Sequence, residues 1–382
     1  MSNPAQPFIV GAGPVGLGAA LFLAKAGHVP RVIEMHKEPS PHSKALAVNP
    51  RTLTILASTG VTQQMLALGS PIYGARFHRQ GRVVAELSFQ GIHPTYPFML
   101  ALSQATTERL LAQALVDAGG TVERGVKLVA CRSMADGMEA TLEPTDGGSQ
   151  EVVHCPWLLG ADGAHSVARR QRNISFVGSS FPEEWHLVDV PLRTSLSAEH
   201  AHILEEGAFL FLLRVVDDTQ QERPDAPLWR VLGNRPQPLT QLVQAEQAGS
   251  PIWASTFSVA HRIAETLASG GVYLAGDAAH IHSPVGARGM NLGLEDAWVF
   301  AQLCQARRLV DYNALRHPVD ERVVQQVALL SKVAAAEAPP YSFLRRFVLP
   351  TAVSVPFIRA RMLATVTGLD HALPSVATTG TN

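Results

Sequence analysis

The chain has 382 residues, 46% of them hydrophobic and 16% charged, with a formal net charge of -1. This composition predicts a sizeable core, organised as two closely connected domains, and excludes a disordered chain. The near-zero charge without a basic run argues against nucleic acid as a partner, and three widely spaced cysteines predict neither disulfides nor a zinc site.

The first elements are a strand, a helix and a second strand. Apolar residues 8–10 predict the first strand, the alanine-rich run over 14–26 predicts the helix, and residues 31–33 predict the second strand, which ends at Glu34. An acid at this point accepts hydrogen bonds from an adenosine ribose and repels a ribose 2'-phosphate. This βαβ unit therefore predicts a nucleotide site without a 2'-phosphate.

The turn of this unit, GAGPVG, has the glycine spacing of a dinucleotide-binding loop. Gly11 permits the tight turn, Gly13 lets the backbone approach a pyrophosphate, and Gly16 lets the helix pack closely on the strand. The helix N-terminus supplies N–H groups for the phosphates. An accidental glycine turn is the alternative, and the motif alone leaves FAD and NAD both open.

The middle of the chain is β-rich. Ser103 predicts the N-cap of a helix over 104–118, and short runs over 121–160 predict a three-stranded meander. Alternating runs over 182–260 predict a separate, mostly antiparallel sheet. The strand GVYLAGD then leads through a glycine-rich turn into a helix that starts near Asn291. The chain thus begins α/β, passes through an antiparallel insert and returns to α/β.

Three segments together carry a family resemblance: GAGPVG, GADGAHSVAR at 160–169 and GVYLAGDAAHIHSPVGARGMNLGLEDA at 271–297. They resemble, in the family's order, the motifs of FAD-dependent aromatic hydroxylases, the class A flavoprotein monooxygenases of the p-hydroxybenzoate hydroxylase type. The resemblance ends near residue 310. It implies that the glycine turn binds FAD.

The resemblance and the element order predict a mixed α/β fold, with a Rossmann-like FAD-binding domain, an inserted antiparallel-sheet substrate domain and C-terminal helices. The FAD-binding domain is expected to be discontinuous. The expected boundaries are 1–74, 98–181 and 266–312 for the FAD-binding domain, 75–97 and 182–265 for the substrate-binding sheet domain, and 313–382 for the C-terminal helical segment.

The resemblance also implies residue roles. In the family, the D-G-x-x-S-x-x-R segment serves flavin and reduced nicotinamide binding, and the aspartate of G-D-A-A-H lies against the ribityl chain and phosphate region. The glycine-rich turn that follows passes the reactive edge of the flavin, and the next helix N-terminus stabilises negative charge near N1–C2=O. Lys44 replaces the family's usual arginine, and Ala287-Arg288 replaces the Gly-Gln of many relatives, so the charge near the flavin is open.

Pro284 and Gly289 are the expected catalytic positions at the flavin edge, with no acid or base assigned. Gln104 has a plainer alternative as a polar first-turn residue, and His280-x-His282 lacks a third ligand at a supporting spacing, so no metal is expected. The expected cofactor-binding residues are Gly11, Gly13, Pro14, Val15, Gly16, Glu34, Lys44, Gln104, Asp162, Gly163, Ser166, Arg169, Gly276, Asp277, Pro284, Gly286, Gly289, Met290 and Asn291.

The implied reaction is hydroxylation of a small aromatic molecule, phenolic or polyketide-like, with NADPH or NADH and dioxygen as co-substrates and a flavin C4a-hydroperoxide as the oxygen donor. Baeyer-Villiger oxidation or epoxidation by the same fold, a flavin-dependent reductase and a non-catalytic flavin-binding module are alternatives. A second G-x-G-x-x-G is absent, which favours transient docking of the nicotinamide beside the flavin. Candidates for the substrate wall, half of which should face away, are Phe209, Phe211, Arg214, Trp229 and Trp253.

We expect a cytoplasmic monomer or homodimer without an integral membrane span, because no stretch reaches the roughly 20 apolar residues that a spanning helix needs. The stretch 343–366 is apolar but interrupted by arginines and prolines, so contact with a bilayer surface is one reading. We favour two short helices, broken at Pro350 and Pro356, that pack on the main domain.

Overall fold

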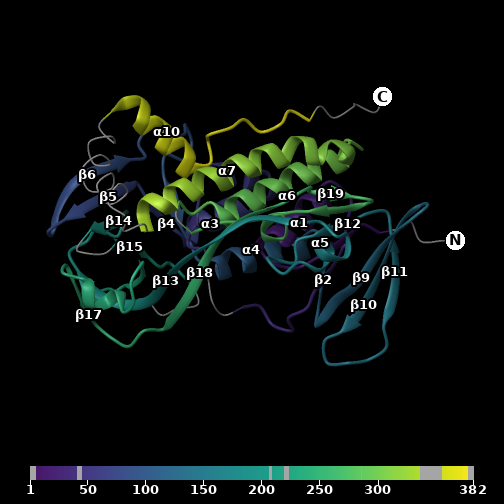
Figure 1. Ribbon diagram of the computed structural model, residues 1–382, viewed down its shortest axis with the longest axis horizontal. Coiled ribbons are helices and arrows are strands. Elements are labelled where there is room, and N and C mark those ends of the chain that lie inside the picture. The colour runs from purple at the N-terminus through teal and green to yellow at the C-terminus, as the bar shows by residue number, and fades with distance from the viewer. Residues whose placement is uncertain are drawn as a thin grey trace.

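The computed structural model describes residues 6–40, 45–205, 209–218, 223–284, 286–335 and 355–376, without the side chains of 181–183 and 334–335. Within this part of the chain, a mainly parallel sheet with helices, a large mainly antiparallel sheet and C-terminal helices pack together (Figure 1). The mixed α/β class predicted from the sequence is confirmed.

The mainly parallel sheet has six strands in the order β19, β20, β12, β1, β2, β8. All neighbours pair in parallel except β19 and β20. The central strands β1 and β12 are fully buried, as expected of a sheet covered on both faces. The strands are β1 (Phe8–Val10), β2 (Arg31–Glu34), β8 (Val122–Arg124), β12 (Leu158–Gly160), β19 (Ala268–Ser269) and β20 (Val272–Leu274).

The helices of this layer pack through small and apolar side chains, and α1 contacts both α4 and α6. The Ser103 hydroxyl accepts the Thr106 N–H at 3.0 Å, so α4 has the predicted N-cap. α6 starts at Gly289, ahead of Asn291, because the Asn291 side chain bonds back to the Ala287 carbonyl. The helices are α1 (Pro14–Lys25), α2 (Pro50–Leu56), η1 (Ala57–Thr59), α3 (Val61–Leu68), α4 (Gln104–Asp117), α5 (Val167–Gln171), η3 (Gly276–Ala278) and α6 (Gly289–Gln305).

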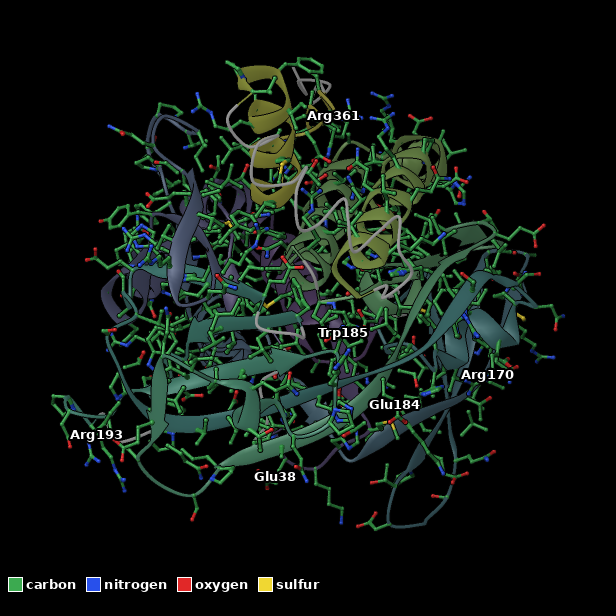
Figure 2. All side chains as sticks on the ribbon, turned by 60° about the vertical axis from the view of Figure 1, so that its left-hand side comes forward. Glu38, Arg170, Glu184, Trp185, Arg193 and Arg361 are labelled. Atoms are coloured by element: carbon green, nitrogen blue, oxygen red, sulfur yellow. The ribbon has the colours of Figure 1, made fainter. Side chains whose placement is uncertain are left out.

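The large sheet has nine strands in the order β21, β18, β13, β16, β15, β14, β5, β6, with β17 paired to β13. Only β14 and β5 pair in parallel. Figure 2 shows Trp185 inside the molecule and Arg193, from the same strand, at its periphery. The strands are β5 (Gly74–Arg79), β6 (Arg82–Ser88), β13 (Phe176–Thr194), β14 (His200–Glu205), β15 (Phe209–Arg214), β16 (Leu228–Gly233), β17 (Ala245–Gln247), β18 (Trp253–Ala264) and β21 (His280–Ile281).

In this sheet β13 begins at Phe176 and β21 lies at His280–Ile281, so the sheet extends beyond the segment 182–265 on both sides. The domain boundaries expected from the sequence therefore stay a prediction. Two smaller sheets complete the β-structure: the predicted meander and a sheet of short strands. They consist of β9 (Val126–Met134), β10 (Gly137–Pro144) and β11 (Glu151–Cys155), and of β3 (Ala47–Val48), β4 (Ser70–Ile72) and β7 (Met99–Ala101).

The C-terminal part contributes α7 (Tyr312–Ala335) and α10 (Pro356–Thr367), after the short η2 (Pro238–Gln241) and η4 (Leu309–Asp311). In Figure 1, α7 runs beside α6, and α10 lies at the end of the molecule that holds β5 and β6. α10 begins at Pro356 as predicted, whereas Pro350 lies outside the described residues. Among the helices described, none combines the length and the apolar character that crossing a membrane requires.

Candidate functional site

Three turns meet at the carboxyl ends of β1, β12 and β20, because these parallel strands are direct neighbours. A Cβ atom on Gly11 would lie 2.3 Å from the Ala161 carbonyl oxygen, so the first two turns touch. A Cβ atom on Gly276 would lie 2.7 Å from Val15 Cγ2, so the third turn touches the first. The three sequence motifs are therefore adjacent, at the edge where such sheets bind ligands.

The glycine turn is tightly packed on one side and open on the other. A Cβ atom on Gly16 would lie 1.9 Å from the Gly11 carbonyl oxygen, whereas a Cβ atom on Gly13 would meet no atom within 4 Å. Gly13 is the N-cap of α1, and no side chain caps the helix. The turn thus combines uncapped N–H groups with free space, which suits a phosphate group.

Glu34 connects the end of β2 to the glycine turn. Its carboxylate accepts the Ala12 N–H at 2.8 Å and the His36 N–H at 2.9 Å. Each carboxylate oxygen can accept a further hydrogen bond, so these contacts leave capacity for ribose hydroxyls. The ribose role of Glu34 stays a prediction.

The turn after β12 is organised by Asp162. Its Oδ2 accepts the N–H groups of Val167 and Ala168 at 2.6 and 3.2 Å, while the buried Oδ1 has no partner among the described residues. Burial raises the pKa of Asp162, and these N–H groups oppose that shift. Ser166 caps α5 by accepting the Arg169 N–H at 3.0 Å. The unpaired Oδ1 is a feature that a bound polar ligand would satisfy.

Arg169 links the turn after β12 to the turn after β20, and its side chain is buried. Its guanidinium donates to the carbonyl oxygens of Ala278 at 2.8 Å and Ala164 at 2.7 Å, and it lies 3.8 Å from the centre of the Phe176 ring. Only 6% of the residue is exposed. We therefore assign Arg169 a bracing function, and its expected contact with flavin or nicotinamide stays a prediction.

Gln104 and Asp277 occupy different surroundings. The Gln104 side chain accepts the Ala45 N–H at 3.1 Å and donates to Glu108 at 2.8 Å, so it holds the segment that directly follows Lys44. Lys44 itself lies outside the described residues. Asp277 is exposed at the turn after β20, at the same edge as the glycine turn.

The turn over 282–289 leaves room beside the start of α6. A Cβ atom on Gly286 or Gly289 would have its nearest neighbour at 3.9 or 3.8 Å, which is ordinary contact distance. No side chain caps α6. Pro284 is exposed, and His282 Nε2 is buried without a partner among the described residues. A flat ring can therefore approach the first N–H groups of α6.

Asn291 fixes this helix start to the small sheet. Its side-chain amide donates to the carbonyl oxygens of Ala47 at 2.9 Å and Ala287 at 2.7 Å, and its Oδ1 accepts the Asn49 N–H at 2.9 Å. Its side-chain amide thus links the start of α6 to β3 and to the residue that follows β3.

Comparison with known proteins identifies the family of this chain. The family model of an FAD binding domain matches residues 5–327. The chain belongs to this FAD-binding family. The 6-methylpretetramide 4-monooxygenase of Streptomyces rimosus is 33% identical over 411 residues, which cover 98% of this chain and 71% of that protein.

Solved structures give the same fold for this FAD-binding protein. The anhydrotetracycline hydroxylase of Streptomyces rimosus superposes with a TM-score of 0.77 at 26% identity, over 98% of this chain and 78% of the other. The p-nitrophenol 4-monooxygenase of Pseudomonas putida DLL-E4 superposes with a TM-score of 0.83 at 20% identity, over 97% and 99%. The chain is an FAD-dependent aromatic hydroxylase that uses NAD(P)H, a small aromatic substrate and dioxygen.

The residues present fit FAD. The open, uncapped start of α1 suits the pyrophosphate, the orphaned Asp162 Oδ1 suits a polar group of the cofactor, and the open, uncapped start of α6 suits the flavin ring.

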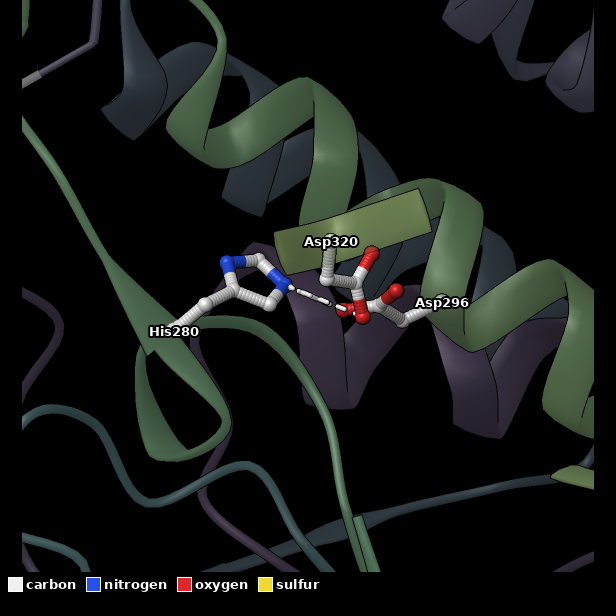
Figure 3. Close-up of side chains that lie close together, drawn as sticks. All are labelled: His280, Asp296 and Asp320. Carbon is white, nitrogen blue, oxygen red and sulfur yellow. Dashed lines mark hydrogen bonds and ion pairs between the residues drawn. The ribbon is translucent and has the colours of Figure 1, made fainter. Parts of the chain in front are cut away.

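A buried ionic network, which the sequence motifs did not reveal, lies between β21, α6 and α7 of the hydroxylase. His280 Nε2 donates to Asp296 Oδ2 at 2.7 Å, and Arg316 donates to Asp296 at 2.8 Å and Asp320 at 2.7 Å. Figure 3 shows His280, Asp296 and Asp320 converging from β21, α6 and α7. Their ligand atoms lie within 4.8 Å of one another, as in a metal site, but the Arg316 guanidinium already binds both carboxylates.

This network makes stability depend on pH. Burial alone lowers the pKa of His280, but Asp296 and Asp320 raise it to about 9 from 6.5. A histidine whose pKa is raised in the folded state stabilises the protein fully below pH 6.5, and that contribution is lost as the pH rises through 9. We expect the hydroxylase to lose at most about 3 kcal/mol of unfolding free energy from this group between those values. Urea denaturation across that range measures it.

The matched variant for this prediction is His280→Gln, which has no titratable ring. Its unfolding free energy should fall less between pH 6.5 and 9 than that of the parent protein. Burial raises the pKa of Asp320 from 3.8 to about 7, so the contribution of Asp320 is lost mainly between those values and only the end of that loss falls in this range. Equal pH dependence in the two proteins would contradict the assignment to His280.

The C-terminal segment of the hydroxylase packs against α2 and α6. Arg51 donates to the carbonyl oxygens of Gly368, at 3.0 Å, and His371. The His371 ring bonds to both Glu295 of α6 and Asp370. Burial raises the pKa of Glu295, but Arg316 and His371 outweigh it and lower that pKa to about 2. The C-terminal segment, in which no motif was found, is therefore tied to α2 and α6 by buried polar contacts.

One face of the large sheet packs against the turn that precedes α6. Phe211 and Leu213 of β15 belong to an apolar cluster that also contains Ala287. Phe209 and Trp253 lie in the neighbouring cluster on the same face. Trp229 instead packs with Leu210 and Leu212 on the opposite face, and Arg214 pairs in register with Trp229. The expected division of the wall candidates is thus observed, and Trp229 and Arg214 point away from the flavin turn.

Sequence reasoning also missed an ion pair on the face of the large sheet that carries Phe211 and Leu213, which we call the inward face. Arg230 donates to both carboxylate oxygens of Asp189 at 2.8 and 2.7 Å and lies 5.0 Å from the centre of the Trp253 ring. Both charged residues are buried. Only the pairing of β13 with β16 brings them together, and no spacing along the chain signals it.

Proposed function

We propose that this hydroxylase acts on a polycyclic phenol of the polyketide type, held between the flavin turn and the inward face of the large sheet. The observation that carries the proposal is the shared apolar cluster of Ala287 with Phe77, Phe211 and Leu213. An apolar, aromatic surface suits a flat fused-ring substrate. Support comes from relatives whose names specify 6-methylpretetramide and anhydrotetracycline as substrates.

We propose the cofactor-binding roles of the motif residues on the same basis. The start of α1, with Gly11, Gly13, Pro14, Val15 and Gly16, would hold the pyrophosphate, and Glu34 the ribose. The turns containing Asp162, Gly163, Ser166, Gly276 and Asp277 would hold the ribityl side, with Gln104 and Lys44 beside them. The turn from Pro284 through Gly286 to Gly289, Met290 and Asn291 would hold the flavin ring.

FAD supplies the redox chemistry when bound, taking hydride from the reduced nicotinamide and passing electrons to dioxygen. The protein would orient the flavin ring and the substrate and shield them from water. The N–H groups at the start of α6 would stabilise negative charge at the pyrimidine end of the ring. Phe77, Phe211 and Leu213 would exclude water from the substrate and hold its ring over the turn.

The deciding experiment measures NADH and NADPH oxidation by the purified yellow protein with a panel of simple phenols and fused-ring phenols, followed by product mass under labelled dioxygen. Hydroxylation of a fused-ring phenol adds one labelled oxygen atom to an intact ring skeleton. A lactone product would instead identify Baeyer-Villiger oxidation, and an unlabelled reduced product a reductase. Stimulation by single-ring phenols alone would overturn the polycyclic assignment.

Phe211 provides a direct test of the substrate wall. Because a buried phenylalanine contributes about 1.5 to 3 kcal/mol, Phe211→Ala should lower kcat/KM by roughly tenfold to a hundredfold. FAD affinity should be unchanged. Trp229→Phe, on the opposite face of the sheet, is the matched control and should leave kcat/KM within a factor of about two. A larger loss in the control than in Phe211→Ala would place the substrate elsewhere.

We also propose that the protein is a cytoplasmic monomer or homodimer. The three cysteines support the location, since all are free thiols, as is usual in a reducing compartment. Sedimentation of the FAD-loaded protein tests the oligomeric state.

A further inference from the structure

Arg288 lies at the start of α6 and is anchored in the C-terminal segment. It is the N-cap residue of the helix, and only 1% of it is exposed. One guanidinium nitrogen, Nη1, donates to the Thr365 carbonyl and lies 3.1 Å from Asp370 Oδ1. The buried Nε has no partner among the described residues. Asp370 is thus the carboxylate that pairs with this cation, and its Oδ1 also lies 3.0 Å from His371 Nδ1.

Arg51 and Glu295 add a second cation and a second carboxylate close to Arg288 and Asp370. Burial lowers the pKa of Arg51 and the charge of Arg288 lowers it further, while the carboxylates of Glu295 and Asp370 oppose these effects. Glu295 is 3.8 Å from Arg51, but it also binds Arg316 and His371. Asp370 Oδ2 is buried without a partner among the described residues, so its charge acts in a poorly solvated region.

The direction of the effect on a flavin follows from the position of Arg288. The N-terminus of α6 carries the positive end of the helix dipole, and Arg288 adds a full charge immediately before it. Together they favour negative charge on a ring held there. A carboxylate beside Arg288 weakens that preference, because it offsets the guanidinium.

We propose that Asp370 sets the reduction potential of the bound flavin by offsetting the charge of Arg288. The inference rests on the proposed placement of the flavin ring at the start of α6. It gives the C-terminal segment a part in the chemistry, as a positioning and charge-setting element outside the sequence motifs. Asp370 touches neither substrate nor flavin in this role, since it acts through the guanidinium.

The test compares the reduction potential of FAD bound to four proteins: the parent, Asp370→Asn, Arg288→Gln and the double variant. Asp370→Asn removes a negative charge and should raise the ratio of reduced to oxidised flavin at fixed potential by roughly threefold to tenfold, where tenfold corresponds to about 30 mV. Arg288→Gln, the residue that many relatives carry, should lower the ratio by a similar factor. The double variant restores the net charge and should return near the parent value.

Asp146→Asn is the matched control, since Asp146 is exposed and paired with Lys37 on the surface. Its flavin potential should equal that of the parent. If Arg288→Gln shifts the potential and Asp370→Asn does not, the inference about Asp370 is wrong while the placement of the flavin holds. If neither variant shifts it, the flavin placement itself is wrong. Shifts in the same direction in both single variants indicate altered packing and also overturn the inference.

If Asp370→Asn does not fold, Arg288→Lys provides the second test. It keeps the charge but loses the guanidinium geometry, so the potential should stay closer to the parent than that of Arg288→Gln. Thermal unfolding and FAD affinity are measured for the same variants. If these residues only pack the segment, both Asp370→Asn and Arg288→Gln lower the stability and the FAD affinity, and they do not shift the reduction potential in opposite directions.

Discussion

Replacing Arg316 with methionine should destabilise the hydroxylase by about 3 to 5 kcal/mol, because it leaves three buried carboxylates without their shared cation. Arg316 is fully buried and binds Glu295, Asp296 and Asp320 together. Methionine keeps a similar side-chain length, so the loss reports the charge and its hydrogen bonds. Urea denaturation of the FAD-loaded protein measures the change.

Arg308→Met is the control for that experiment. Arg308 pairs with Asp311 on the surface, where both side chains are more than a third exposed. Exposed ion pairs of this kind contribute at most about 1 kcal/mol. If the two variants lost similar amounts of unfolding free energy, the buried network would not have the stabilising role that its geometry indicates.

Gly16→Ala should abolish FAD binding and lower the unfolding free energy of the apoprotein by more than about 3 kcal/mol. The added methyl group would lie 1.9 Å from the Gly11 carbonyl oxygen, a backbone atom that cannot rotate away. The helix and the glycine turn must therefore move apart. Fluorescence titration with FAD and urea denaturation of the apoprotein measure the two effects.

Gly13→Ala separates ligand contact from folding. Gly13 has an extended backbone that alanine adopts freely, and an added methyl group meets no protein atom within 4 Å. The apoprotein should therefore keep its stability within about 0.5 kcal/mol. FAD affinity should fall by about tenfold or more, because the methyl group enters the space for the pyrophosphate. Unchanged FAD affinity in this variant would show that the phosphates lie elsewhere.

The features of the site that could be predicted are those set by residues close together in the sequence. Gly11, Asp162 and Gly276 each follow a short apolar strand, and the strands are adjacent and parallel, so the three turns had to meet. The capped start of α4 at Ser103 was equally local. Period-two alternation predicted that half of the wall candidates face away, but only the strand register showed that Trp229 belongs to that half.

The remaining part depends on contacts between distant segments. Arg51 meets Gly368 across 317 positions, and Arg288 meets Asp370 across 82. Neither pair has a spacing that a helix or a strand would impose. Arg316 and Asp320 do lie four residues apart on α7, which signals an ion pair. That spacing usually indicates a solvated helix face, so burial could be learned only from the packing of α6 against α7.

The contact of Arg51 with the chain around Gly368 also orders events during synthesis. Arg51 leaves the ribosome early, within the segment that forms the glycine turn and its first helices, yet its carbonyl partners are made more than three hundred residues later. A nascent chain can pair its early strands and still lack the carbonyl groups that Arg51 binds. On the proposed placement of the flavin at the start of α6, stable retention of the cofactor is expected only after Gly368 and His371 have been released, so FAD capture should follow the synthesis of this segment.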